Sequence, residues 1–143
     1  MSKQLLQSAI KEVSAIHAFF VGWFRTGASH PDLSEIEQVL APDFRMISPD
    51  GLASERKGVI DAIRNGRGLR GADFAITIVD PRPVVEFDGA VLLEFIEQQY
   101  RDGRTTRRLS TALFTPEESA PRGVLWRVRN LSVQFVRKGR IEA

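Results

Sequence analysis

The chain has 143 residues, 43% of them apolar and 27% charged, which predicts one soluble domain spanning residues 1–143 with a substantial core. Its 20 Lys and Arg residues nearly balance 18 Asp and Glu residues, so the formal charge of +2 gives no electrostatic case for nucleic acid. The lack of cysteine excludes disulfides and Cys-ligated metals, and two histidines are too few for a multi-histidine site. We therefore expect neither a metal nor an organic cofactor.

The N-terminal segment does not have the pattern of a signal peptide, because Lys11 and Glu12 interrupt its apolar run. No stretch of the sequence is long and apolar enough to span a bilayer. The expectation is a cytoplasmic protein without a membrane partner.

Apolar residues recur at three- and four-residue steps from residue 3 to about 26, which predicts a first helix with Glu12 off its apolar side. A second, short helix is expected to begin at Asp32, which has the capping-box spacing to Glu35. The apolar residues of segment 55–65 predict a third helix.

The apolar period changes to two after residue 72, which is typical of strands. Asp88–Gly89 and Asp102–Gly103 are hairpin signals, while Pro81 and Pro83 are expected to break or bend the chain. Strands are predicted at 44–48, 74–80, 84–87, 90–101, 105–115 and 124–136. Helices followed by hairpin-linked strands predict an α+β fold rather than alternating βαβ units.

Strands of ten or more residues in a small protein must twist and curl. We therefore expect the three helices of the N-terminal half to pack in the concave face of a strongly curved antiparallel or mixed sheet. Such a cone leaves a hollow between the helices and the sheet, and that hollow is the natural place for a small ligand.

The order of elements, and four segments of the sequence, resemble the nuclear transport factor 2-like (cystatin-like cone) superfamily, and within it an uncharacterised SnoaL-like branch. The four segments are LAPDFRMISPDG (40–51), RKGVIDAIRNG (56–66), VLLEFIEQQYRDGRTTRRLSTALF (91–114) and LWRVRNLSVQF (125–135). The resemblance covers nearly the whole chain. It implies the cone fold, but not one activity, because this fold carries unrelated functions.

Ketosteroid isomerases belong to the same superfamily, but the positions that match their catalytic residues differ in type. Ser48 takes the place of the aspartate base, Phe19 or Phe20 that of the tyrosine donor, and Thr111 lies near the place of the second aspartate. Serine without a base behind it cannot accept a carbon-bound proton, and a phenyl ring cannot donate to an enolate. Steroid isomerisation is therefore not expected.

Glu97 is the strongest candidate for a catalytic residue. It shares one strand face with three apolar residues, so that face is expected to point into the hollow. Arg107 or Arg108 on the next strand is the expected partner, depending on the hairpin register. His17 on the first helix is the candidate assistant, because a Glu–His pair is usable for acid–base chemistry. The competing interpretation places Glu97 in a structural ion pair at the wet rim. Glu94, on the opposite face of the strand, is expected to be exposed.

The walls of the hollow are expected to combine aromatic and apolar side chains with a few polar groups. On the last strand, the positions that match the histidines or acids of SnoaL-like cyclases are Asn130 and Ser132. The predicted lining residues are Phe20, Trp23, Phe24, Met46, Ser48, Phe95, Arg107, Thr111, Asn130 and Ser132.

If Asn130 and Ser132 point inward, Leu131, Val133 and Phe135 form an apolar patch on the outer sheet face. Such a patch is typical of an interface, and predicts a homodimer through the sheet. Three functions stay open at this stage. The first is a domain that binds a small, mostly apolar ligand. The second is a cofactor-independent cyclase, isomerase, dehydratase or hydrolase that uses Glu97, and the third is a protein interaction module that acts through the sheet face.

Overall fold

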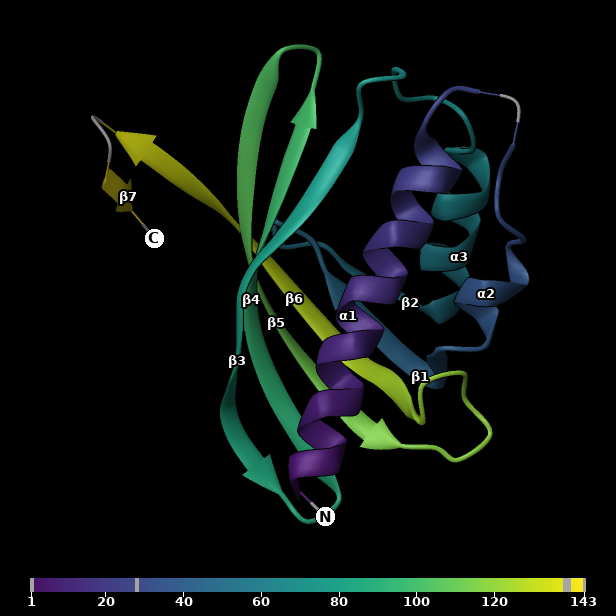
Figure 1. Cartoon of the computed structure of the whole chain (residues 1–143), viewed down its shortest axis with the longest axis vertical. Coiled ribbons are helices and arrows are strands. Elements are labelled where there is room, and N and C mark those ends of the chain that lie inside the picture. The colour runs from purple at the N-terminus through teal and green to yellow at the C-terminus, as the bar shows by residue number, and fades with distance from the viewer. Residues whose placement is uncertain (1, 28, 138–139, 143) are drawn as a thin grey trace.

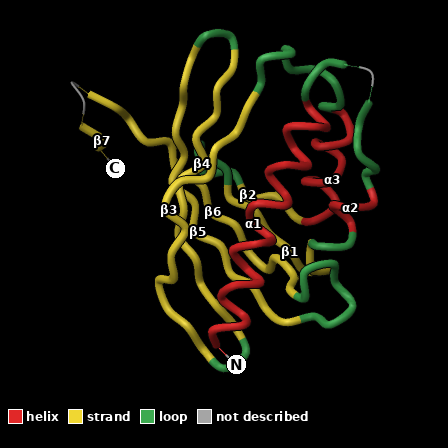
Figure 2. The backbone as a smooth tube through the Cα atoms, viewed as in Figure 1, coloured by secondary structure: helices red, strands yellow, loops and turns green. Residues whose placement is uncertain are grey.

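The computed structural model describes residues 2–27, 29–137 and 140–142, and side chains between residues 3 and 132. Helices gather on one side of a long, curved sheet (Figures 1 and 2). The described elements are α1 (Ser2–Phe24), α2 (Ser34–Glu37), β1 (Leu40–Ile47), β2 (Ala53–Glu55), α3 (Arg56–Asn65), β3 (Ala75–Phe87), β4 (Ala90–Arg101), β5 (Arg104–Pro116), β6 (Val124–Arg137) and β7 (Arg140–Glu142).

The strands form one mixed sheet in the order β2-β1-β6-β5-β4-β3, with β7 paired to β6. The β1–β6 pair is parallel, and the other pairs are antiparallel. This arrangement confirms the predicted α+β cone. Among the described helices, none combines the length and apolarity needed to cross a membrane.

Helix α1 is amphipathic, as predicted, but its buried side is rotated relative to the predicted stripe. The buried apolar side chains of α1 are Leu5, Ala9, Val13, Ile16, Phe19 and Trp23. Glu12 lies on this side and is fully buried, so its predicted place off the apolar side was wrong. It can be buried because Arg122 Nε and Trp126 Nε1 donate hydrogen bonds of 2.8 and 2.9 Å to its carboxylate.

Helices α2 and α3 are short. Helix α2 begins at Ser34, two residues after the predicted start, and its N-cap residue Leu33 makes no side-chain capping bond. Asp32 Oδ1 instead accepts a hydrogen bond of 2.9 Å from the Ser34 backbone N–H in the turn before the helix. Helix α3 buries Val59, Ile60 and Ile63, in agreement with the predicted third helix. Strand β1 begins four residues before the predicted position, and the short β2 was not predicted.

Strand β3 continues through its two prolines, so of the two predicted outcomes the chain bends there and does not break. Its pairing with β4 shifts register between Val79 and Arg82 and again between Pro83 and Val85, which bends the strand. The prolines are tolerated because β3 is an edge strand of the sheet, where a missing N–H leaves no ladder partner unsatisfied.

Strand β6 carries a bulge that decides which of its side chains face the helices. Leu113 pairs with Val128, whereas the next residue of β5, Phe114, pairs with Trp126. Arg127 is therefore an extra residue in β6, and the inward positions change from even to odd numbers beyond it. Trp126 points inward before the bulge and Arg129 after it, and both are buried.

Candidate functional site

A cavity of about 510 Å³ lies between α1, α3, the segment after α3, and the inner face of the sheet. This volume is typical of sites for small organic molecules. Its helix side is apolar and includes Phe20, Phe24, Val59, Ala62 and Ile63. Its sheet side is polar where Glu97, Gln99, Arg108 and Arg129 meet.

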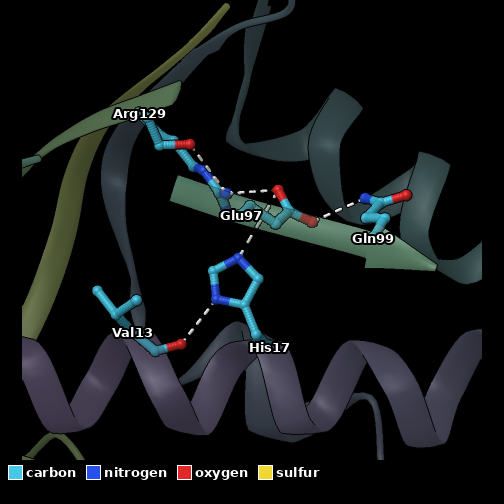
Figure 3. A network of polar contacts seen from close by, with 6 residues as sticks. Val13, His17, Glu97, Gln99 and Arg129 are labelled. Carbon is cyan, nitrogen blue, oxygen red and sulfur yellow. Dashed lines mark hydrogen bonds and ion pairs between the residues drawn. The ribbon is translucent and has the colours of Figure 1, made fainter. Parts of the chain in front are cut away.

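Glu97 is positioned by the alternation of β4. The inward residues of this strand are buried from Val91 to Gln99, as the period of two predicted, and Glu97 is only 3% exposed. Arg129 Nη2 donates a hydrogen bond of 2.9 Å to Glu97 Oε1, and Gln99 Nε2 donates one of 2.7 Å to Oε2 (Figure 3). Both carboxylate oxygens are thus occupied within the protein.

The predicted partner of Glu97 was wrong. Arg108 is its register partner across the β4–β5 hairpin but makes no ion pair with it at 4.0 Å or less. Arg107 lies on the outer face, where its Nε donates a hydrogen bond of 2.9 Å to Gln98 Oε1. Arg129 was not predicted, because the prediction that Asn130 and Ser132 point inward places the Arg129 side chain on the outer face of the sheet. It also stacks over the Phe95 ring, with 5.3 Å between its guanidinium carbon and the ring centroid.

Glu97 is ionised at neutral pH. Burial raises the pKa of its carboxyl group, but the charge of Arg129, the hydrogen bond from Gln99 and the charge of Arg108 together outweigh burial. The net pKa lies below the ordinary value of 4.5. A carboxylate held in this way is a weak proton acceptor near pH 7.

His17 lies beside this ion pair on α1. Its Nδ1 is 2.7 Å from the Val13 carbonyl oxygen, which makes Nδ1 the protonated nitrogen, and its Nε2 lies 3.9 Å from Glu97 Oε1 (Figure 3). Burial and the charge of Arg129 lower the pKa of His17 to about 3, so the ring is neutral at pH 7. His17 Nε2 has no hydrogen-bond partner in the described part of the protein.

Four of the predicted lining residues do line the cavity, namely Phe20, Phe24, Met46 and Ser48. Trp23 and Phe95 are buried in the core beside it instead, and Trp23 Nε1 donates a hydrogen bond to the Ile63 carbonyl. The Ser48 hydroxyl is bonded to the Asp50 carboxylate in the turn after β1.

The other predicted lining residues lie on the outer face of the sheet, and their placement in the hollow was wrong. Thr111 pairs with Asn130 across β5 and β6, and both alternate with inward, buried neighbours. Ser132 is exposed, and Leu131 points inward and lines the cavity. Leu131 therefore cannot belong to an outer dimer patch. The predicted contribution of Val133 and Phe135 falls outside the described side chains.

The sequence contained one signal for the missed Arg129. Arg129 and Leu131 occupy the same strand face by the period of two, and an apolar Leu131 favours the inward side. The prediction instead placed Asn130 and Ser132 inward, because they match the polar positions of SnoaL-like cyclases. Long, paired arginine side chains can be buried when their charge is matched, as Arg129 is by Glu97.

No protein-family model matches the chain, and no curated protein matches its sequence. Solved structures do match. An NTF-2 like protein of unknown function from Pseudomonas aeruginosa has a TM-score of 0.79 and 19% identity, covering 88% of this chain and 98% of that one. The chain has the nuclear transport factor 2-like fold.

Two further structures show how widely this NTF2-like fold is used. The CaMKII hub of S. rosetta has a TM-score of 0.66 and 14% identity, with 92% of this chain and 95% of that one covered. A putative ketosteroid isomerase from Parabacteroides distasonis has a TM-score of 0.58 and 12% identity, with 85% and 84% covered. At these identities the similarity shows the fold alone, and function must be argued from the site.

Proposed function

We propose that this NTF2-like domain binds a small, mostly apolar molecule in the cavity between its helices and its sheet. The observation that carries the proposal is the cavity itself, about 510 Å³ in volume, with apolar side chains along α1 and α3. Protein interiors are normally close-packed, and a hollow of this size must be stabilised against collapse. Here the curved sheet and the two helices hold it open.

Binding fits the polar groups of the cavity better than proton transfer does. The Glu97 carboxylate is bonded to Arg129 and Gln99, and its pKa is lowered, so it is poorly matched to accept or deliver protons at pH 7. His17 is neutral and buried, and it lies 3.9 Å from Glu97, beyond a hydrogen bond. We therefore do not propose the acid–base chemistry considered from the sequence.

The predicted interaction module and homodimer have less support in the described residues. The cavity is not filled by side chains, as a pure interaction module would require. Thr111, Asn130 and Ser132 make part of the outer face polar, and Leu131 of the predicted patch is turned inward. The same face also carries half-buried or exposed apolar side chains, namely Leu92, Ile96, Leu109, Leu113 and Val128. Homodimerisation and cytoplasmic location stay predictions, and so does membership of the SnoaL-like branch.

A neutral fluorescent probe tests the proposed function. N-phenyl-1-naphthylamine is apolar and uncharged, and its fluorescence rises when it leaves water. We expect saturable binding to the unaltered protein and its loss in Ala62→Phe, because residue 62 lines the cavity and a phenyl ring there occupies ligand space.

The matched control is Ala18→Phe, which adds the same ring on an exposed position of α1 outside the cavity. It should bind the probe as the unaltered protein does. Equal binding by all three proteins would place the probe elsewhere, and no binding by the unaltered protein would reject the proposal for apolar ligands of this size.

A further inference from the structure

We propose that the ligand of this cavity is amphipathic and carries one carboxylate, which Arg108 binds on the sheet side. The inference rests on the proposed function, because it names the class of molecule that the cavity takes. It is drawn from the balance of charge around the cavity and from the different chemistry of its two walls.

The charges that line the cavity do not cancel. Three guanidinium groups, those of Arg70, Arg108 and Arg129, face one carboxylate, that of Glu97. Arg129 and Glu97 neutralise one another through their hydrogen bond of 2.9 Å. Two positive charges are left over, and in a partly enclosed space such charges are screened less than on an open surface.

Arg108 is the best placed of these groups to bind an anion. It is half-buried in β5 and lines the cavity. Within the described residues it makes no ion pair at 4.0 Å or less and no side-chain hydrogen bond. Its neighbour Arg107, by contrast, is bonded to Gln98 on the outer face. Arg108 therefore offers a cavity-facing guanidinium whose donors are available to a ligand.

Arg70 adds a second positive charge at the rim. Backbone hydrogen bonds of 2.7 Å from Arg70 N to Phe24 O, and from Thr26 N to Arg70 O, fix it against the end of α1. Burial, together with the charges of Arg101 and Arg108, lowers the pKa of Arg70, which means that these cations repel one another. A bound anion between them relieves that repulsion.

Arg129, the most deeply buried of the three arginines, gives a further observation in support of the inference. Arg129 is 95% buried, donates both of its hydrogen bonds through Nη2, and leaves Nε without a partner in the described part of the protein. Glu97 matches the charge of this guanidinium, but the unsatisfied Nε donor favours one further hydrogen-bond acceptor close to it.

The wall of the cavity opposite Arg108 determines the chemistry of the remaining part of the ligand. The side chains of Phe20, Phe24, Val59 and Ile63 offer no charged group across the cavity from Arg108. A molecule with a charge at each end would lose the hydration of one charge against this apolar wall without compensation, whereas a monocarboxylate on an apolar body can place each part against the matching wall. An arginine is also suited to bind a carboxylate with two donors at once.

A matched pair of ligands tests the inference in the full chain. 2-Naphthylacetic acid and 2-naphthylacetamide differ by one charge and have nearly the same shape, and each is titrated against bound N-phenyl-1-naphthylamine at low ionic strength and neutral pH. We expect the acid to displace the probe at a concentration roughly tenfold lower than the amide, as one charge-assisted interaction provides.

Two variants locate the effect. Arg108→Gln should bring the acid to the value of the amide, whereas Arg107→Gln, on the outer face, should keep the roughly tenfold difference. Equal displacement by acid and amide in the unaltered chain overturns the inference, and so does a difference that survives Arg108→Gln. Displacement by neither compound overturns it as well, while binding of the neutral probe then leaves the proposed function standing. The comparison in the unaltered chain is decisive even if a variant does not fold.

Discussion

Arg129 and Glu97 form an ion pair of 2.9 Å in which the two side chains are 6% and 4% exposed. Two charges taken out of water require close geometry and further hydrogen bonds to compensate for lost hydration. Gln99 Nε2 donates one such hydrogen bond to the Glu97 carboxylate, and Ser110 Oγ accepts another from the Arg129 guanidinium. The pair joins β4 to β6 across β5, and so ties together the polar side of the cavity.

Removing the charge of Glu97 is expected to destabilise the fold strongly. Glu97→Gln leaves Arg129 buried without a counter-charge, which costs about 3–5 kcal/mol of unfolding free energy. Glu94→Gln is the matched control on the same strand, because Glu94 pairs with exposed Arg82 on the outer face and such pairs contribute about 0–1 kcal/mol. Urea unfolding of both variants checks the difference. Equal losses would mean that the Glu97–Arg129 pair does not contribute more than a surface pair.

Acid is expected to destabilise the protein through His17. Its pKa is about 3 in the folded chain and 6.5 as the ordinary value, so between these pH values the unfolded chain binds a proton that the folded chain does not. Stability from this group is therefore complete above pH 6.5 and is lost as pH falls towards 3, by up to about 1.4 kcal/mol per pH unit. Its nearest charged groups are Glu97 on β4 and Arg129 on β6.

Urea unfolding at pH 4, 5, 6 and 7 isolates this effect when His17→Gln is compared with the unaltered chain. The comparison is needed because burial raises the pKa of Glu12, which makes stability change in the opposite direction as pH falls. The variant should lose less stability on acidification, whereas His30→Gln, which removes the other histidine of the chain, should follow the unaltered protein. Parallel curves for all three proteins would contradict a buried, neutral His17.

Glu12 should prove important for stability although it plays no part in the cavity. Glu12→Ala removes the acceptor of the Trp126 indole N–H, a fully buried donor, and leaving such a donor unsatisfied costs about 1–3 kcal/mol. Lys11→Ala, at the exposed neighbouring position of α1, should change stability by no more than about 0.5 kcal/mol. Thermal unfolding of the two variants gives the comparison, and a neutral Glu12→Ala would show that the Glu12–Trp126 bond is dispensable.

The sequence predicted the architecture well where a pattern is local. Three correctly predicted features depend on neighbouring residues, namely the helical period of α1, the alternation of β4 and the Asp102–Gly103 turn. The alternation of β4 places Glu97 on the inward face. The alternation of β6 failed because a bulge shifts its phase, and a bulge is set by how two distant strands pair.

The same limit applies to the charged partners of the site. Arg129 lies 32 residues from Glu97 in the chain, and Arg122 lies 110 residues from Glu12. Charge alone suggests exposure for each of these residues, and only the tertiary fold shows that two unfavourable burials compensate one another. The candidate site was thus predicted through Glu97, His17 and two of its aromatic residues, but the arginine that pairs with Glu97 was missed.

The β4–β5 hairpin depends on glycine at one of its two turn positions. Asp102 and Gly103 have φ angles of 52° and 73°, as a two-residue turn matched to the twist of the strands requires. A Cβ at Gly103 meets no atom within 4 Å, so Gly103→Ala acts through backbone strain alone and should cost about 1–2 kcal/mol. Gly89→Ala, in the open turn before β4, also meets no atom within 4 Å, and φ there is outside the left-handed region. It should therefore be nearly neutral in the same thermal unfolding experiment, and a loss as large as that of Gly103→Ala would exclude left-handed strain as the cause.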